Sequence, residues 1–215
     1  MITLSVTLLA SCTSGSKPSP GGSGSGSPAA STAAPEALGP SACVTASKAS
    51  GQAAPFKLVS PRTLCGLPQN NSQAEQSAGG EMVSAVEGDL QNVNGGPNYG
   101  QQTSWVSQGY QIPQNAAGVY RSISFTGLMG TFNPQAAASA VESSVASGYT
   151  FTSVPPGPNG GVMACGALNS TSENCVWSTP TTLGLIMIID TTKQLTGTNI
   201  AANALRIRDV LEVPI

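Results

Sequence analysis

Apolar and polar residues alternate along much of the chain after residue 41, and this alternation predicts strands. In residues 119–125, Val119, Ile123 and Phe125 stand among polar neighbours, as in a strand with one buried face. Residues 183–189 are continuously apolar, as in a strand covered on both faces. The same reading predicts strands at 56–59, 149–154, 161–167 and 175–178, and one more near Trp105 in an otherwise irregular loop at 94–118.

Helical spacing of apolar residues predicts two or three helices. The first spans 72–92, the second begins at the N-cap pair Asn133–Pro134 and stops at Gly148, and the third spans 199–212. The third carries an apolar stripe at helical spacing, formed by Ile200, Ala204, Ile207 and Leu211. Its charged residues lie off the stripe and are expected to be solvated; they are Arg206, Arg208, Asp209 and Glu212.

The order of these elements predicts an α+β fold for residues 41–215. We expect one antiparallel sheet with two or three helices on one face. A domain of about this length buries roughly 70% of the surface of its unfolded chain, so a single core is sufficient. The domain is expected to be stabilised by disulfides and preceded by a disordered linker.

Composition excludes several classes of function. Only 8% of the residues are charged and the net charge is −2, so the chain lacks the clustered Lys and Arg of a nucleic-acid-binding protein. It contains no histidine, which excludes Ser-His-Asp and Cys-His catalysis, His-ligated zinc and His-ligated haem. We therefore expect no enzymatic activity, no cofactor and no metal site.

The N-terminus resembles that of a bacterial lipoprotein precursor. Residues 2–10 form a short, uncharged and mostly apolar stretch, which runs into Leu9-Ala10-Ser11-Cys12. In that family this lipobox implies cleavage before Cys12 and a diacylglycerol on its sulfur, with residues 1–11 as the signal peptide. A signal peptide begins with a positively charged region, but no Lys or Arg precedes the apolar stretch here. We therefore expect a signal peptide truncated at its start. The alternative is a leader without this role and an ordinary thiol at Cys12.

Residues 12–40 are expected to be a lipidated cysteine followed by a disordered tether. Of positions 13–40, all but Lys17, Glu36 and Leu38 are Ser, Thr, Gly, Pro or Ala. Such a segment buries too little apolar area to offset its ordering entropy. Two acyl chains hold a protein on a membrane durably, so the expected location is the outer face of the cell membrane.

The other four cysteines are expected to form two disulfides. An exported chain with an even number of cysteines favours disulfides, and four cysteines allow three connectivities. We favour the pairs nearest in sequence, Cys43–Cys65 and Cys165–Cys175; the second would bridge a hairpin. A metal site is the alternative, but the chain has no CxxC motif and no histidine.

Residues 119–190 are similar to extracytoplasmic domains found in lipoproteins and single-span membrane proteins of high-GC Gram-positive bacteria. The similarity is carried by Thr126-Gly127-Leu128-Met129-Gly130, Gly160-Gly161-Val162-Met163-Ala164-Cys165, Cys175-Val176-Trp177 and Thr182-Leu183-Gly184-Leu185. It implies export and the Cys165–Cys175 bridge, and it implies no catalytic residue.

The segment 92–115 combines aromatic residues with Asn, Gln and Gly, which is the chemistry of carbohydrate or peptide contact. Tyr99, Trp105 and Tyr110 are therefore candidate ligand-binding residues. The alternative is a polar loop whose aromatic rings lie in the core. Trp177, next to Cys175, is expected to be a core residue.

Three hypotheses of function follow. The first is a lipid-anchored binding module for an envelope polysaccharide or a protein partner. The second is a hydrolase that works with carboxylates instead of histidine, which requires two acids to converge in a cleft. Its candidates are Glu75, Glu81, Glu87, Asp89, Glu142 and Asp190. The third is an accessory or sensory subunit of a membrane protein.

Overall fold

The computed structural model describes residues 43, 55–70, 100–112, 118, 120–145, 148–191 and 197–215. All of them belong to the compact unit 36–215. The expected signal peptide, Cys12, the linker 13–40, the helix expected at 72–92 and Tyr99 lie outside the described residues.

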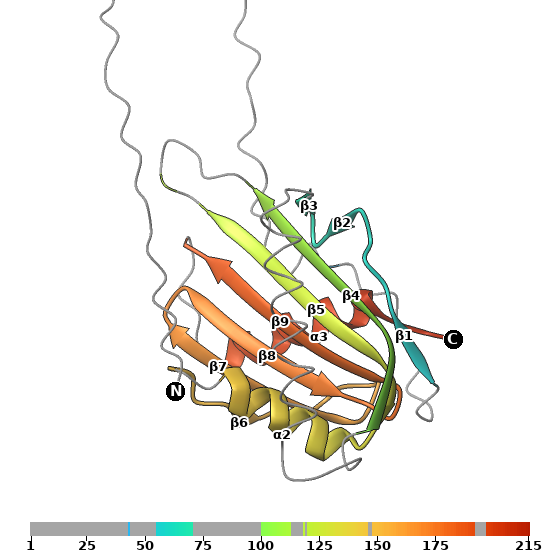
Figure 1. Ribbon diagram of the computed structural model, residues 1–215. Coiled ribbons are helices and arrows are strands. Elements are labelled where there is room, and N and C mark those ends of the chain that lie inside the picture. The colour runs from blue at the N-terminus through green and yellow to red at the C-terminus, as the bar shows by residue number, and fades with distance from the viewer. Residues whose placement is uncertain are drawn as a thin grey trace, which may run out of the picture. The chain divides into compact units, whose positions relative to one another are not determined.

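Within the described residues, eight antiparallel strands form one sheet with the order β2-β3-β4-β5-β9-β8-β7-β6 (Figure 1). The longest neighbours, β4 and β5, pair along their whole length, and β5 pairs with β9 at the centre of the sheet. In chain order the strands are β2 (Thr63–Leu64), β3 (Leu67–Asn70), β4 (Gly100–Ile112), β5 (Arg121–Phe132), β6 (Thr152–Ser153), β7 (Val162–Asn169), β8 (Ser172–Ser178) and β9 (Thr182–Asp190). The antiparallel sheet of the predicted α+β fold is therefore confirmed.

Strands β2 and β3 are joined by a two-residue turn at Cys65 and Gly66. Both residues have positive φ, 53° and 79°. Such angles at both central positions define the type I′ turn, whose twist matches that of the flanking strands. The turn places Cys65 where the chain reverses.

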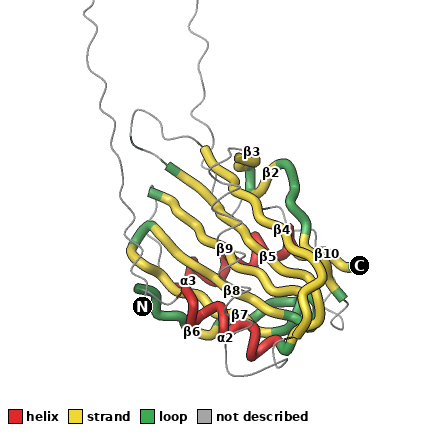
Figure 2. The backbone as a smooth tube through the Cα atoms, in the orientation of Figure 1, coloured by secondary structure: helices red, strands yellow, loops and turns green. Residues whose placement is uncertain are grey.

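A second, two-stranded ribbon joins β1 (Phe56–Leu58) to β10 (Glu212–Pro214) (Figure 2). It is attached to the end of the main sheet through Phe56. The amide of Phe56 donates to Thr181 Oγ1 at 2.9 Å, and the Thr181 hydroxyl donates to the Phe56 carbonyl at 3.0 Å. The ribbon thus fastens the beginning of the domain to its end.

The helices α2 (Pro134–Val145) and α3 (Gly197–Leu211) pack on opposite faces of the sheet (Figures 1 and 2). Neighbouring residues of a strand point to opposite faces. On β8, Val176 packs with Ala137 and Val141 of α2, whereas Trp177 packs in the cluster that contains the apolar side of α3. The expectation of helices on one face is therefore wrong for these two. We name the two sides the α2 face and the α3 face.

Both helices begin and pack as their sequences predict. Asn133 Oδ1 accepts a hydrogen bond from the Ala136 amide at 3.3 Å, which confirms the N-cap of α2. All four residues of the predicted α3 stripe are buried in the core of the α3 face. Neither described helix is long and apolar enough to cross a membrane.

The core of the α3 face is built around Trp177, which is completely buried. Its ring stacks on Phe125 with centroids 6.0 Å apart. Gly184 lies opposite Trp177 in β9, and a side chain there would collide with the indole ring. The prediction of Trp177 as a core residue is confirmed.

Both predicted disulfides, Cys43–Cys65 and Cys165–Cys175, are present. Cys165 and Cys175 are direct partners in the β7–β8 register, so this bridge crosses a hairpin as expected. Both bridges reach into the core of the α3 face.

Two segments differ from the prediction made for them. Strand β4 runs for 13 residues where an irregular loop with one short strand was expected. The strand expected at 149–154 contracts to Thr152–Ser153, at the edge of the sheet.

Candidate functional site

Strands β4 and β5 carry a row of hydroxyl and amide side chains on the α2 face. At its centre the hydroxyls of Ser107 and Thr126 are hydrogen-bonded at 3.1 Å across the two strands. Trp105 lies two residues before Ser107 on the same face, and half of its surface is exposed (50%). We call this set the Trp105 surface; it comprises the exposed Trp105, the partly exposed Ser107, Gln111, Tyr120 and Ser124, and the buried Ser122 and Thr126 beneath them.

A second aromatic ring lies at the other end of the Trp105 surface. The Tyr120 hydroxyl donates to Gln111 Oε1 at 3.3 Å, and the Tyr120 side chain is half-buried. From Trp105 to Gln111 the strand rises about 20 Å. The Trp105 surface is therefore an elongated polar strip with one ring toward each end.

Alternation along β4 and β5 directs these side chains to the α2 face, and their position in the sheet separates them from helix α2. Helix α2 packs mainly on β7, β8 and β9, where the α2 face is apolar and includes Val176, Leu183 and Leu185. On β4 and β5 the same face is hydroxyl-rich beyond Leu128. One face of the sheet thus changes from an apolar helix-binding half to a polar half.

The three predicted ligand-binding residues do not lie together on one exposed surface. Trp105 is exposed, as contact with a ligand requires. Tyr110 has no exposed surface and points to the α3 face, because it lies five positions, an odd number, after Trp105 along the strand. Burial raises the pKa of Tyr110 to about 12. Tyr99 lies outside the described residues.

Tyr120 was missed by sequence reasoning. It could have been found from the alternation of the predicted strand, because Tyr120 lies two residues before Ser122 and therefore on the same polar face.

Arg208 and Glu212 form a buried ion pair, so the expectation that they are solvated is wrong. Arg208 Nε donates to Glu212 Oε2 at 2.7 Å, and both side chains are almost fully buried. Arg208 also donates to the carbonyls of Pro156 and Gly160 at 2.8 and 2.9 Å, and Asn159 Nδ2 donates to Glu212 Oε2 at 2.8 Å. The pair holds the 156–160 loop in place, and its polar groups are bonded within the protein rather than directed to a ligand.

The candidate acids of the hydrolase hypothesis do not meet where the structure describes them. Glu142 lies on α2, whereas Asp190 is ion-paired with Arg121 at 3.3 Å on the α3 face. A different carboxyl, Glu173, lies close enough to Asp190 for that charge to affect it, but Glu173 has no exposed surface. The other four candidates, Glu75, Glu81, Glu87 and Asp89, lie outside the described residues. Among the described residues no cluster of three His, Cys, Asp or Glu side chains is present.

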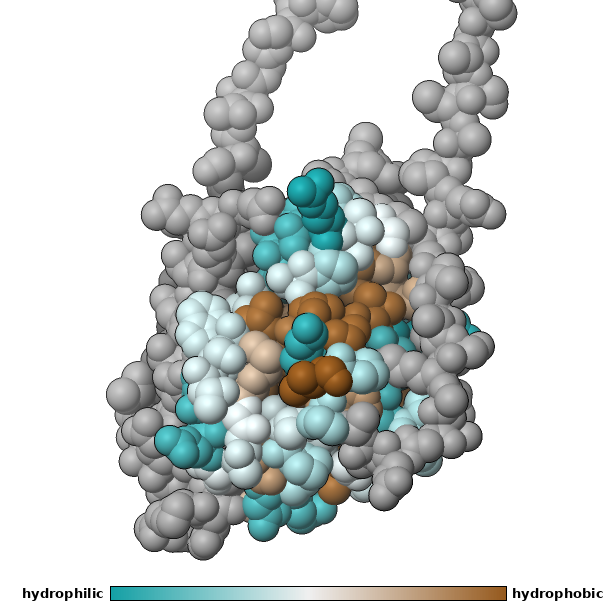
Figure 3. Space-filling view, turned by 90° about the vertical axis from the view of Figure 1, so that its right-hand side faces the viewer, coloured by the Kyte–Doolittle hydropathy of each residue, from teal (hydrophilic) through white to brown (hydrophobic). Residues whose placement is uncertain are grey.

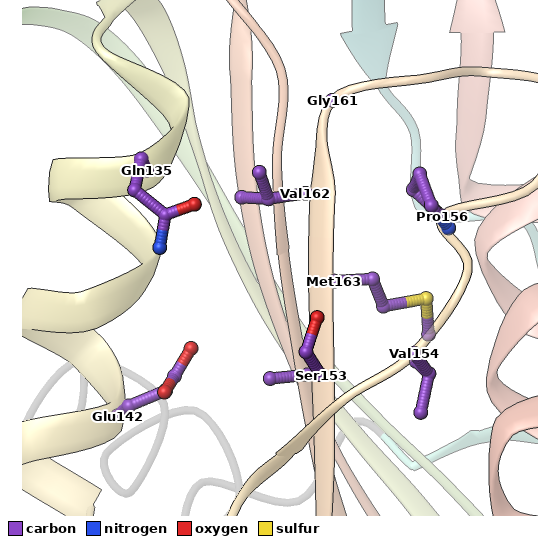
Figure 4. A pocket seen from close by; sticks show the side chains of 9 residues that line it. Gln135, Glu142, Ser153, Val154, Pro156, Gly161, Val162 and Met163 are labelled. Atoms are coloured by element: carbon purple, nitrogen blue, oxygen red, sulfur yellow. The ribbon is translucent and has the colours of Figure 1, made fainter.

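A small cavity of about 200 Å³ lies between α2 and the β6–β7 edge of the sheet (Figure 4). Gln135 and Glu142 enter it from α2, and Ser153 and Val162 face them from the strands. Glu142 is half-buried, and burial raises the pKa of its carboxyl above the usual range.

The surface on the side of β1 and β10 is apolar at its centre (Figure 3). In the β1–β10 ribbon and the residues that follow its strands, Val59 and Val213 are half-buried and Ile215 is 77% exposed. Lys57 is exposed on the same ribbon, opposite Val213.

The chain was also compared with known proteins. No protein-family model matches it, and neither a characterised protein nor a solved structure was found to be similar.

Proposed function

We propose that this protein is a lipid-anchored extracytoplasmic module that binds a neutral envelope polysaccharide through the Trp105 surface and catalyses no reaction. The observation that carries the proposal is the half-exposed Trp105 ring beside the partly exposed hydroxyl of Ser107, which the buried hydroxyl of Thr126 holds in place through a hydrogen bond. An exposed ring offers an apolar face to the C–H side of a sugar. Hydroxyl and amide groups next to it offer both donors and acceptors to sugar hydroxyls.

The charge of the Trp105 surface supports a neutral ligand. Strand β4 contains no charged residue, and the one charged residue of β5, Arg121, faces the other side and pairs with Asp190. A phosphorylated or acidic ligand would find no cation on this strip. The elongated shape also fits several sugar units in a row better than one small molecule.

The anchoring part of the proposal rests on the lipobox and on the disulfides. Both bridges are formed, and disulfides persist in oxidising, extracytoplasmic compartments. A linker with the composition of 13–40 spans roughly 30 Å as a flexible coil, so it would hold the binding module away from the membrane. Expression in a lipoprotein-competent bacterium tests the anchor. Intact mass should show a diacylglycerol adduct on Cys12, and Cys12→Ser should release the protein into the medium.

Tryptophan fluorescence tests the ligand. The chain has two tryptophans, and Trp177 is fully buried, so Trp105 should report binding. Linear neutral glucan oligosaccharides should change the emission of the full-length protein saturably, whereas uronic-acid oligosaccharides of the same length should not.

The matched variants are Trp105→Ala and Gln101→Ala, followed by calorimetry because the first removes the reporter. Gln101 is exposed on the same strand but on the opposite face. We expect at least tenfold weaker binding for Trp105→Ala and no change for Gln101→Ala. Equal affinities of both variants and the wild type would contradict the proposal.

A second candidate function is an accessory subunit of a membrane protein. It is favoured by the apolar surface on the side of β1 and β10 (Figure 3), and by the exposed side chain of Ile215, which follows β10 in the sequence. Replacement Ile215→Ser should then reduce capture of a membrane protein by the anchored chain without changing glycan binding.

A further inference from the structure

The cavity between α2 and the β6–β7 edge combines three polar groups with an apolar floor. Glu142 and Gln135 lie seven residues apart on α2, two turns along the same side of the helix. Ser153, on the edge strand β6, faces them (Figure 4). Val162 and Ala164 of β7 form the wall between them.

Glu142 has no counterion among the residues that the structure describes. It is the only charged residue between Arg121 and Glu173 in the sequence, so α2, β6, β7 and the loop from β6 to β7 contain no cation. No described residue forms a hydrogen bond or ion pair with its carboxylate. A half-buried carboxylate without a partner loses hydration without compensation, so a cationic ligand would gain from binding here.

The other groups narrow the chemistry of that cation. Gln135 Nε2 donates to Ser139 Oγ at 3.5 Å, which leaves its Oε1 available as an acceptor. The Ser153 hydroxyl is a further acceptor. Together with the Glu142 carboxylate they offer three acceptors, which equals the number of donors on a primary ammonium group.

The size of the cavity sets the length of the ligand. About 200 Å³ is below the range of roughly 300–1,000 Å³ of sites for drug-sized molecules. The apolar wall suits a short methylene stem that ends in the charged group.

We propose that this cavity binds the ammonium end of a short alkylamine, with the nitrogen between Glu142, Gln135 and Ser153 and the methylene stem against Val162 and Ala164. The site is independent of the Trp105 surface. The amine belongs either to a lysine-like side chain of a peptide or to a free small amine. Both share this chemistry, and the experiment below distinguishes them.

The test is an NMR titration of the amide resonances of the full-length protein. The probes are n-butylammonium, Nα-acetyl-lysine methylamide and, as the uncharged control, n-butanol. We expect saturable shifts confined to α2, β6 and β7 with both amines, with dissociation constants on the order of millimolar, and none with n-butanol. Tighter binding of the lysine derivative assigns the site to a peptide side chain, and tighter binding of n-butylammonium assigns it to a free amine.

Variants test the roles of the residues. Glu142→Gln keeps the shape and should weaken amine binding at least tenfold, and Ser153→Ala should weaken it severalfold. Ser143→Ala is the matched control, because Ser143 is exposed on the same helix and is not part of the cavity lining. Trp105→Ala should bind amines normally, which separates this proposal from the polysaccharide proposal. Absence of saturable shifts with both amines, or unchanged binding by Glu142→Gln, would overturn the inference.

Discussion

Glu173 is expected to make the protein less stable as the pH rises. Its side chain has no exposed surface, and neither carboxyl oxygen has a hydrogen-bond partner among the described residues. Burial, and secondly the charge of Asp190, raise the pKa of Glu173 to about 8, from 4.5 for an ordinary glutamate. The folded protein therefore holds a proton on Glu173 at neutral pH that the unfolded chain releases.

The sign and size of the effect follow from proton linkage. Because the folded-state pKa lies above the unfolded-state pKa, the stability is complete below about pH 4.5 and decreases until the pH passes about 8. With 1.36 kcal/mol per pKa unit, the loss between about pH 5 and pH 8 is roughly 3 kcal/mol. Glu173→Gln cannot ionise and should lack this loss.

Urea unfolding at about pH 5 and pH 8, with disulfides intact, measures the effect through the midpoint at constant m-value. At the higher pH, Glu173→Gln should be more stable than the wild type by roughly 3 kcal/mol, and at the lower pH the two should nearly coincide. Glu142→Gln is the graded control, because its half-buried carboxyl should give a smaller effect of the same sign. Parallel pH profiles for Glu173→Gln and the wild type would refute the reasoning.

Three further sets of substitutions test the packing on Trp177, the buried ion pair and the Cys165–Cys175 bridge. Gly184→Ala places a methyl group against an indole ring of the core, and it should lower stability by about 1–3 kcal/mol in thermal unfolding. Arg208→Met leaves the carboxylate of Glu212 buried without its cation and should lower the free energy of unfolding by about 3–5 kcal/mol. Adding Glu212→Gln should recover part of that loss. Additive effects of the two changes would argue against coupling between the two side chains. Replacing Cys165 and Cys175 by serine opens a short hairpin bridge and should cost about 3 kcal/mol, whereas unchanged stability would show that pairing of β7 with β8 suffices.

Local patterns predicted the elements with a clear apolar pattern or a clear cap. The alternation at 119–125, the N-cap pair Asn133–Pro134 and the apolar run at 183–189 each correspond to an element of the structure. The two disulfides were also predictable, because each pair is close in sequence. Nothing in these patterns states which face of the sheet a helix covers. The opposite placement of α2 and α3 depends on how the chain crosses the sheet, and was therefore not predicted.

The candidate sites were harder to predict, because their partners are distant in sequence. Strand β4 looks like a loop in the sequence, since most of its residues are polar or glycine, although Val106 and Tyr110 pack in the core of the α3 face. It is a strand because β5 pairs with all of it. Arg208 lies beside the apolar stripe of α3. Because a charged arginine is usually exposed unless it is paired, the sequence predicts a solvated side chain. Its partners at Pro156 and Gly160 belong to a loop that α3 reaches only in the folded chain.

The Cys43–Cys65 bridge determines how the domain would respond to mechanical force. A pull on the chain from its N-terminal side reaches residue 43 and passes through the sulfur atoms directly to residue 65. The loop between them, which includes β1, then carries no tension, so the β1–β10 pairing is shielded from the load. Reduction of the bridge would route the same force through β1 and peel it from β10.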